Sequence, residues 1–360
     1  MSRNIVLSYT FSQDSKLTNH FIHNELITIL DLVHTLGSLS AVAKEIGISY
    51  RHLWNEINRW ENEFKEPLLI RERGKACELS AFGNRLLWAE KEVQAKYATQ
   101  IAELRAGIEQ AYAKAIDTEA KIISLRGCSD EAVRLFRDDA IQNKLYLELS
   151  FNSSLQGLKD LQDNKCHIAG FNFPLGATSS SKAAKTFSTY LSKDIKLIGF
   201  ATRIQGMAVA RGNPLSLHSF LDLSLKKAIF INRNEGSGTR VLCDELMTTS
   251  GLTSKDINGY ENTVNSHALV AASVASGKAD AGLCVQSIAS HMNLDFVPMV
   301  KEIYYFATRD TFLKKEETKK FIQILNENGW LEKASSLEGY DFRDCGKIYD
   351  ISHLGWNLSP

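Results

Sequence analysis

The sequence predicts an α/β protein built in three parts. Residues 24–80 show short runs of helical apolar spacing followed by two short strands, and residues 81–115 keep one helical pattern that no proline interrupts. From Lys121 onward, short apolar strands alternate with helical stretches, which is the pattern of α/β units with largely parallel sheets. The predicted boundaries are residues 1–80 for the first domain, 81–118 for a connecting helix, 119–348 for the large domain and 349–360 for a C-terminal tail.

Length, composition and cysteine spacing restrict the class of protein. At 360 residues, with 44% hydrophobic and 23% charged residues, the chain has the balance of a globular protein of two or three domains. Lys+Arg and Asp+Glu are equal at 42 each, so the net charge favours no particular partner. The six cysteines lie far apart without a CxxC pair, which predicts reduced thiols and no metal site. Because we recognise no signal peptide and no bilayer-spanning apolar run, we expect a cytoplasmic protein without membrane contact.

Three helices are predicted in the first domain from their apolar spacing and their ends. The first helix stops at Gly37 and the second at Gly47, where a tight turn is easiest without a Cβ atom. Ser49 can cap the third helix, and Pro67 closes it. The apolar stripe of the third helix is Leu53, Ile57, Trp60 and Phe64. Two short strands, residues 68–70 and 77–79, are expected to follow around a turn.

Residues 37–54 have the spacing of a helix-turn-helix that binds double-stranded DNA. Such a motif needs small residues where its helices cross, a turn glycine, and a cap that starts the recognition helix. Ala41, Ala43, Gly47 and Ser49 meet these needs. The residues predicted to face base edges are Tyr50, Arg51, His52 and Asn55, and those predicted to reach phosphates are Arg59, Arg71, Arg73 and Lys75.

The alternative is a small helical domain with scattered arginines. Between Ser49 and Lys75 there are six Lys or Arg and five Glu, so helix pattern alone favours DNA binding only modestly. Residues 25–89, however, resemble the winged helix of LysR-type regulators, and more closely that of the molybdate-responsive ModE-type regulators. The residues that carry the resemblance are 37–41, 47–51, Trp54, Pro67, Leu68 and 79–83, whereas Glu72 in the short wing departs from the pattern. The resemblance implies a winged helix-turn-helix.

The connecting helix has the pattern of a coiled-coil seam. Apolar residues recur at steps of three or four, at Phe82, Leu86, Ala89, Val93, Tyr97, Ile101, Leu104, Ile108 and Ala111. A helix of this length outside a large core usually pairs with a second copy. We therefore expect a linker that makes a homodimer or a higher homo-oligomer.

Seven strands and three polar loops are predicted in the large domain. The strand candidates are residues 122–125, 145–151, 167–171, 195–200, 228–231, 281–283 and 296–298. Small hydroxyl residues follow a strand and precede a helix in residues 127–130, 152–154 and 234–240. Helix starts present free N–H groups and a positive dipole end, so loops that converge on one cleft would hold a small anion through neutral donors.

The predicted ligand-binding residues come mainly from these loops. They are Ser129, Ser153, Ser154, Gln205, Ser237, Gly238, Thr239 and His267. Taken alone, Ser129 and Ser154 are more simply helix caps, and His267 is more simply a capping or packing residue. The run from Gly236 to Arg240 is neither a dinucleotide fingerprint nor a P-loop, since it lacks a third spaced glycine and a Gly-Lys-Ser/Thr end.

No catalytic residue is predicted. The sequence has no GxSxG elbow, no HExxH motif and no acid pair at a telling spacing, so an enzyme is the less favoured hypothesis. A second alternative is a binding protein whose N-terminal module contacts another protein. A third is a regulator that senses an organic or cofactor-like ligand.

Residues 121–348 resemble the periplasmic-binding-protein-like domains that are fused to helix-turn-helix regulators and to molybdenum-cofactor proteins. The resemblance is carried by residues 203–206, 213–214, 232–240, 271–282, 295–298 and 339–341. It implies a two-lobed, type-2 α/β fold hinged by two crossovers, with residues 121–202 and the C-terminal part in one lobe and residues 205–300 in the other. It also implies an oxyanion effector such as molybdate or tungstate, with sulfate and phosphate as related ligands, and no cofactor. The expected function is ligand-responsive transcription regulation.

Overall fold

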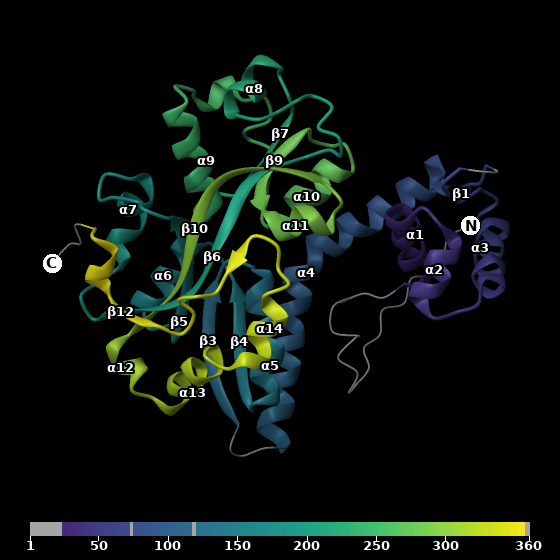
Figure 1. Ribbon diagram of the computed structural model, residues 1–360. Coiled ribbons are helices and arrows are strands. Elements are labelled where there is room, and N and C mark those ends of the chain that lie inside the picture. Colours follow the sequence, from purple (N-terminus) through teal and green to yellow (C-terminus); the bar gives the residue numbers. More distant parts are fainter. Residues whose placement is uncertain (1–23, 73–74, 117–119, 357–360) are drawn as a thin grey trace. The chain divides into compact units, whose positions relative to one another are not determined.

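The computed structural model describes residues 24–72, 75–116 and 120–356. It divides into two compact units, residues 1–98 and 99–360, and the division falls within the long helix α4 (Ala81–Ile116). The first unit holds three helices and a small hairpin, and the second holds a large sheet covered by helices (Figure 1). Residues 1–23, where no signal peptide is recognised, lie outside the described ranges.

Local sequence signals set the helix ends of the first unit. Asn24, Ser38 and Ser49 each accept a backbone N–H at the start of a helix, and Gly37 and Gly47 end the first two helices in the left-handed conformation. The elements are α1 (Glu25–Leu36), α2 (Leu39–Ile46), α3 (Tyr50–Phe64), β1 (Leu69–Ile70) and β2 (Glu78–Leu79). The core is Leu26, Ile27, Ile29, Leu30, Val33, Leu39, Val42, Ala43, Leu53, Ile57, Leu68, Leu69 and Leu87. The predicted helices and hairpin are confirmed.

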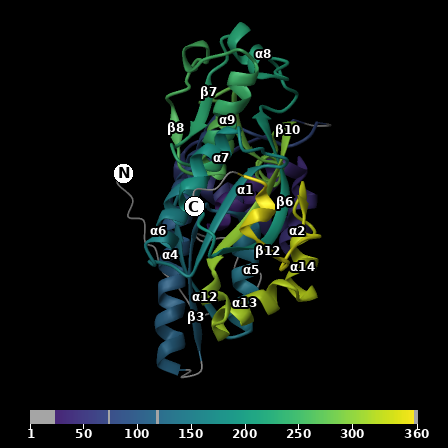
Figure 2. The same ribbon diagram turned by 90° about the vertical axis from the view of Figure 1, so that its left-hand side faces the viewer.

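Two strands of 15 residues, β6 (Ile195–Val209) and β10 (Asp295–Arg309), lie antiparallel at the centre of the large sheet (Figure 2). The strand order is β4-β3-β5-β10-β6-β9-β7-β8, and β11 and β12 also pair with β6. The other strands are β3 (Lys121–Gly127), β4 (Leu145–Phe151), β5 (Ile168–Pro174), β7 (Phe230–Arg233), β8 (Thr263–Val264), β9 (Ala281–Val285), β11 (Tyr340–Asp341) and β12 (Ile348–Asp350). The sheet is mixed rather than largely parallel, because the two crossing strands run in opposite directions and pair antiparallel with their neighbours.

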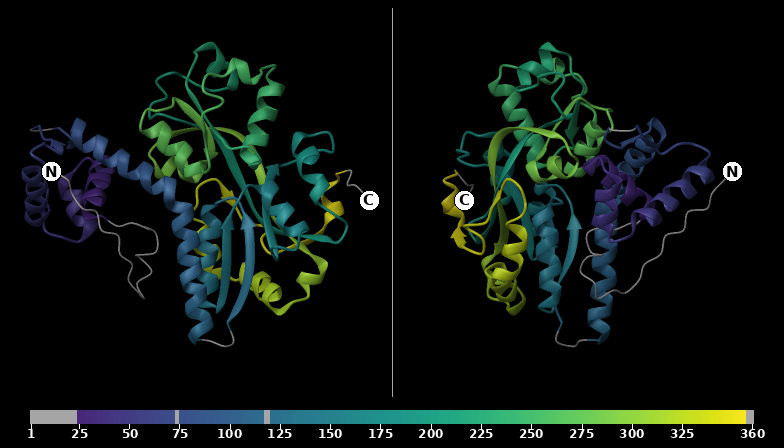
Figure 3. Two further views of the ribbon diagram at one scale, coloured as in Figure 1. Left: turned by 180° about the vertical axis from the view of Figure 1, so that it is seen from behind. Right: turned by 45° about the vertical axis from the view of Figure 1, so that its right-hand side comes forward.

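Helices cover the sheet in two lobes, which confirms the two-lobed fold (Figure 3). The first lobe (residues 121–202 and the C-terminal part) contains α5 (Glu131–Gln142), α6 (Ser154–Gln162), α7 (Lys182–Phe187), α12 (Asp310–Leu313), α13 (Glu316–Leu325) and α14 (Asn328–Ala334). The second lobe (residues 205–300) contains α8 (Phe220–Leu225), α9 (Gly238–Thr249), α10 (His267–Ala275) and α11 (Gln286–His291). Aromatic rings fill the first lobe: Phe136 meets Phe321 at 4.9 Å and Trp330 at 5.4 Å between ring centroids. None of the described helices is long and apolar enough to cross a membrane.

The second half of α4 packs on the first lobe. Ala102 and Ala106 are 1% and 4% exposed, and Ala106 belongs to the aromatic core of that lobe. Arg105 pairs with Asp138 of α5 at 3.3 Å. The helix expected to be a linker and a dimer interface is therefore also a structural part of the large domain.

The segment expected to be a C-terminal tail also belongs to the domain. β12 pairs with β6, and Ile351 and Trp356 are each 6% exposed within the core of the first lobe. The Trp356 Nε1 atom donates to the carbonyl of Ala177 at 2.9 Å. Residues 357–360 lie outside the described ranges.

Candidate functional site

The predicted DNA-reading residues lie on the outer face of α3. Ser49 caps the helix, and its Oγ atom accepts a hydrogen bond from the backbone N–H of His52 at 3.2 Å. Leu53 and Ile57 are fully buried on the opposite side, which turns the side chains of Arg51, His52 and Asn55 toward solvent. Tyr50 is 49% exposed. Within the described ranges, these four side chains form no hydrogen bond or ion pair, so their polar groups are available to a partner.

The predicted phosphate-contacting residues are more constrained. Arg59 pairs with Glu56 at 2.6 Å, and Lys75 pairs with Glu72 at 2.5 Å. Arg71 pairs with Glu61 at 3.2 Å, and its guanidinium lies 4.3 Å from the ring centroid of Trp54.

Phosphate binding would have to compete with these exposed ion pairs, which are individually weak. Arg73 lies outside the described residues.

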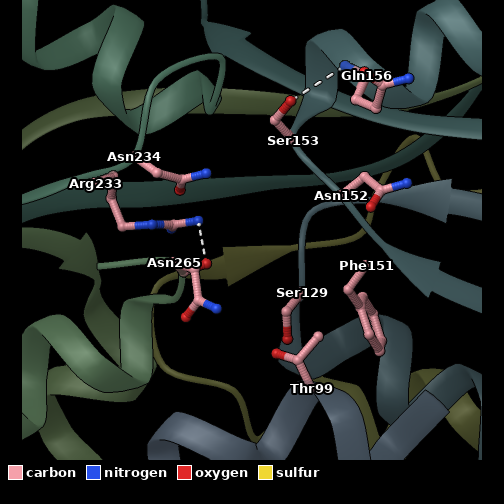
Figure 4. A pocket seen from close by; sticks show the side chains of 9 residues that line it. All are labelled: Thr99, Ser129, Phe151, Asn152, Ser153, Gln156, Arg233, Asn234 and Asn265. Atoms are coloured by element: carbon pink, nitrogen blue, oxygen red, sulfur yellow. Dashed lines mark hydrogen bonds between the residues drawn. The ribbon is translucent and has the colours of Figure 1, made fainter. Parts of the chain in front are cut away.

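A cavity of about 240 Å³ lies where polar loops of the two lobes meet (Figure 4). The first lobe contributes Ser129 from the loop after β3, residues 151–153 from the end of β4, and Gln156 from α6. The second lobe contributes Arg233, Asn234 and Asn265. α4 contributes Thr99. Because the strands β3, β4 and β7 all end here, the cavity occupies the position where α/β proteins hold ligands.

Only two of the predicted ligand-binding residues, Ser129 and Ser153, line this cavity. The Ser153 Oγ atom accepts a hydrogen bond from the backbone N–H of Gln156 at 3.2 Å, so this residue also caps α6. The others do not line it: Ser154, Gln205, Ser237, Gly238, Thr239 and His267 are all almost fully buried. Their role in ligand binding stays a prediction.

Several of these buried residues form a hydrogen-bonded network between the lobes. The Ser154 hydroxyl donates to Asn172 at 3.3 Å, and Asn172 Nδ2 donates to Glu302 at 2.9 Å. The Gln205 amide donates to both Glu302, at 2.8 Å, and Thr239, at 2.9 Å. Ser154, Gln205 and Thr239 thus hold the crossing strands and the helix starts in place.

Gly238 and Ser237 have local structural reasons for their identity. A Cβ atom at Gly238 would come within 2.5 Å of the Asn172 side chain, so only glycine lets α9 begin this close to β5. Ser237 caps α9 by accepting from the backbone N–H of Arg240 at 3.2 Å, and its hydroxyl donates to the carbonyl of Asn234.

Arg233 is the most distinctive residue of the cavity, and the sequence analysis missed it as a ligand-binding residue. It is 3% exposed at the end of β7, and its NH2 group donates to the carbonyl of Asn265 at 3.0 Å. Its Nε atom has no hydrogen-bond partner among the described residues, and none of their carboxylates lies within 4.0 Å of its guanidinium. Burial, together with the nearby Arg203, lowers the pKa of Arg233. A usable signal was an arginine two residues after the predicted strand 228–231, just before a glycine-containing loop.

The neighbouring buried arginine, Arg203, is fully neutralised. Its guanidinium pairs with Asp130 and with Glu302, the latter at 3.0 Å, and these carboxylates hold its pKa well above the usual value against the effect of burial. Asp130 also accepts a hydrogen bond from the Tyr340 hydroxyl at 2.8 Å. Both nearby carboxylates are therefore in contact with Arg203, and Glu302 acts on Arg233 only from a distance, without forming an ion pair with it.

His267 is a second unsatisfied group in this region. It is 4% exposed, and its Nδ1 atom has no hydrogen-bond partner among the described residues. Burial, with Arg233 and Arg203 nearby, lowers its pKa well below the usual value, so its ring is neutral at pH 7.

Comparisons with known proteins agree with this arrangement. Residues 138–326, more than half of the chain, match the family model described as the PBP superfamily domain. The chain belongs to the PBP superfamily. Residues 25–84 match the model of the bacterial regulatory helix-turn-helix proteins of the lysR family. The chain thus joins a LysR-type helix-turn-helix to a PBP domain, as the resemblance implied, and neither model describes an enzyme.

The relatives match different lengths of the chain. YvgK of Bacillus subtilis (strain 168) is 32% identical over 200 residues, which are 55% of this chain and 64% of that protein. A Clostridium pasteurianum protein described as lying in the ferredoxin 2Fe-2S gene 5' region is 32% identical over 109 residues, 30% of this chain and 96% of its own length. The crystal structure of CbnR, a LysR family transcriptional regulator, aligns with 84% of this chain and 99% of its own, at 16% identity and a TM-score of 0.40.

Proposed function

We propose that this chain is a ligand-responsive, DNA-binding transcription regulator whose PBP domain senses a small anion. The observation that carries the proposal is Arg233, a buried guanidinium that faces a polar cavity without a carboxylate partner. A buried charge without a counter-ion is costly, and an anionic ligand would remove that cost. The helix-turn-helix with unpaired polar side chains on α3 supports double-stranded DNA as the other partner.

Molybdate and tungstate are the first candidates for the anion. Ser129, Ser153 and the amides of Asn152 and Asn234 supply neutral donors beside the charge of Arg233, which suits a tetrahedral oxyanion. The cavity could also take a larger molecule. Its volume of about 240 Å³ equals the liquid volume of roughly eight waters. This is more space than the five heavy atoms of a tetrahedral oxyanion occupy.

An organic anion is therefore the second candidate. Phe151 gives the cavity an apolar wall that a bare oxyanion would not use. Both candidates need the guanidinium of Arg233, so a single variant tests what they share.

The test is a thermal-shift series on the purified protein with molybdate, tungstate, sulfate, phosphate and several small organic acids. A ligand at about a hundred times its dissociation constant adds roughly 2.7 kcal/mol to the free energy of unfolding. We expect Arg233→Gln to weaken binding of the responding anion by roughly 10- to 100-fold, because a charge-assisted hydrogen bond is lost. Arg211→Gln is the matched control, since it removes the same charge from an exposed position outside the cavity.

The outcomes separate the candidates. A shift confined to molybdate and tungstate would support a metal-oxyanion sensor, and a shift with organic acids alone would support the second candidate. No shift with any anion, or full binding by Arg233→Gln, would contradict the proposed anion site.

A further inference from the structure

α4 forms part of the wall of the ligand cavity. Thr99 lies on this helix and lines the cavity together with Ser129 and Phe151, as Figure 4 shows. α4 is the helix that continues from the helix-turn-helix module, and it extends from residue 81 to residue 116 without interruption. A residue of the connecting helix is thus exposed to whatever occupies the cavity.

The position of Thr99 in the wall is held firmly. Glu103, one helical turn further on, accepts a hydrogen bond from the backbone N–H of Phe151 at 2.6 Å. Phe151 itself lines the cavity, so this bond ties α4 to the loop that carries Asn152 and Ser153. Ala102 is buried, and Glu109 pairs with Arg137 of α5. Residues 99–109 are therefore attached to the first lobe by a hydrogen bond, an ion pair and apolar burial.

The Thr99 hydroxyl is also chemically suited to an anion. It makes no hydrogen bond to any other described residue. A hydroxyl can donate a hydrogen bond to an oxyanion and loses only the rotational freedom of one short side chain. Its methyl group can contact an apolar part of a ligand. Both contacts would be made by the connecting helix rather than by either lobe.

We propose that α4 is part of the anion site and that Thr99 binds the ligand through its hydroxyl. This proposal rests on the proposed function of the cavity as an anion site. The ligand then touches the connecting helix directly. Its presence can alter the packing of α4 at residues 99–103, in addition to any closure of the two lobes. Side-chain choice at position 99 would help determine which anion the protein accepts.

The first experiment measures anion affinity by isothermal titration calorimetry with molybdate and with inorganic phosphate. Thr99→Val keeps the shape of the side chain and removes the hydroxyl, and we expect about tenfold weaker binding of the anion that binds the wild type. Gln100→Ala, the next residue on the exposed side of α4, should leave affinity unchanged. Wild-type affinity in Thr99→Val, alongside lost binding in Arg233→Gln, would overturn the role of Thr99 and leave the anion site standing.

The second experiment needs no knowledge of the ligand. In a Cys77→Ser background the remaining native thiols are buried, so Thr99→Cys introduces the accessible thiol. Its reaction rates with a sulfonate-bearing and an ammonium-bearing methanethiosulfonate are compared with those of Gln100→Cys. If Thr99 shares a cavity with Arg233, the anionic reagent should be favoured about fivefold more at position 99 than at position 100.

Adding Arg233→Gln should abolish that preference. Equal rate ratios at positions 99 and 100 would overturn the proposal, whichever anion the protein binds. A charge preference at position 99, combined with no binding of any anion tested, would keep Thr99 in the cavity and count against the proposed function instead.

Discussion

Two buried arginines, 30 positions apart in the sequence, differ in what neutralises them. Arg203 has Asp130 and Glu302 in direct contact, whereas Arg233 has the Asn265 carbonyl and the open cavity. The first is a structural ion pair that fixes the crossing strands. Under the proposed function, the second is the charge that an anion would pair with, and binding would then offset its cost to the stability of the free protein.

The pKa of His267 responds to burial and to the positive charge of Arg233 and Arg203. Its pKa is lowered in the folded protein, so the unfolded chain takes up its proton first as the pH falls. The stabilising contribution of the neutral ring is therefore complete above about pH 6.5 and is lost as the pH falls toward the folded pKa. We expect His267→Gln to weaken the dependence of the melting temperature on pH between pH 7 and pH 5. The free energy of unfolding should lose up to about 1.4 kcal/mol per pH unit of its dependence on pH.

His291 provides the control for that measurement. It lies 3.1 Å from Glu131, which raises its pKa, so its contribution is present below about pH 6.5 and is lost as the pH rises. The effect of His291→Gln on the pH dependence should have the opposite sign, and it should be smaller because this side chain is 62% exposed. Equal profiles for wild type and His267→Gln would contradict a buried neutral histidine.

At the scale of single elements, α3 is a helix with one buried side and one unpaired polar side. Its cap and its fully buried Leu53 and Ile57 fix its rotation, so the residues offered to a partner are set by local sequence. The wing is different, because Arg71 and Lys75 already have acidic partners. Sequence discrimination is therefore expected to come from α3 rather than from the wing.

The test of α3 is Arg51→Ala combined with Asn55→Ala. Each lost base contact should cost about 1–3 kcal/mol in affinity for a double-stranded DNA site, which would first be selected from a random pool with the wild-type protein. Asn62→Ala, on the exposed surface near the end of the same helix, is the control. Gel-shift titration that gave the same affinity for the double variant and the wild type would reject the base-reading assignment.

Across the whole molecule, α4 has two apolar faces with different roles. Ala102, Ala106 and Ala113 are buried, and Ala106 lies in the core of the first lobe, whereas Leu104 is 65% exposed and belongs to the seam expected from the sequence. Phe82 and Leu86 of that seam pack against the core of the first unit, whereas Val93 and Tyr97 are exposed like Leu104. An apolar stretch left exposed within one chain is what a second copy would cover. The homodimer itself remains a prediction.

Leu104→Lys tests whether the seam of α4 forms a homodimer, because a desolvated lysine opposes association at an apolar interface. Light scattering after gel filtration should show a shift from dimer toward monomer. Gln142→Lys adds the same charge at an exposed position at the end of α5, outside α4, and should leave the mass unchanged. A monomeric wild type, or a dimeric Leu104→Lys variant, would contradict the seam as the interface.

Local sequence patterns predicted the helices and strands well, but they predicted the tertiary contacts between them less well. The cap of the third helix at Ser49, the ends of the first two helices at Gly37 and Gly47, and the existence of seven strands follow from turn residues and apolar spacing. β6 and β10 are longer than the apolar runs at 195–200 and 296–298 suggested, because Arg203, Gln205 and Glu302 interrupt those runs. Such polar residues fit inside a strand only when they satisfy one another across the sheet, and that partnership cannot be seen in one segment alone.

The candidate site was harder for a related reason. A serine that caps a helix and a serine that binds a ligand have the same local sequence, and Ser154 is placed against Cys128 and Asn172 only by the fold. Arg233 was overlooked because an isolated arginine is usually a surface residue. Whether Arg233 forms an ion pair depends on its distance to every acidic group, and those distances are set only in the folded domain.

The composition of the cavity wall determines which classes of ligand the cavity excludes. Its nine side chains comprise one guanidinium, amides, hydroxyls and a phenyl ring, and none is a carboxylate. A polyamine or a divalent cation would leave water without finding an opposite charge in this cavity, and it would also be repelled by Arg233. We therefore expect the cavity to exclude purely cationic ligands, whatever their shape.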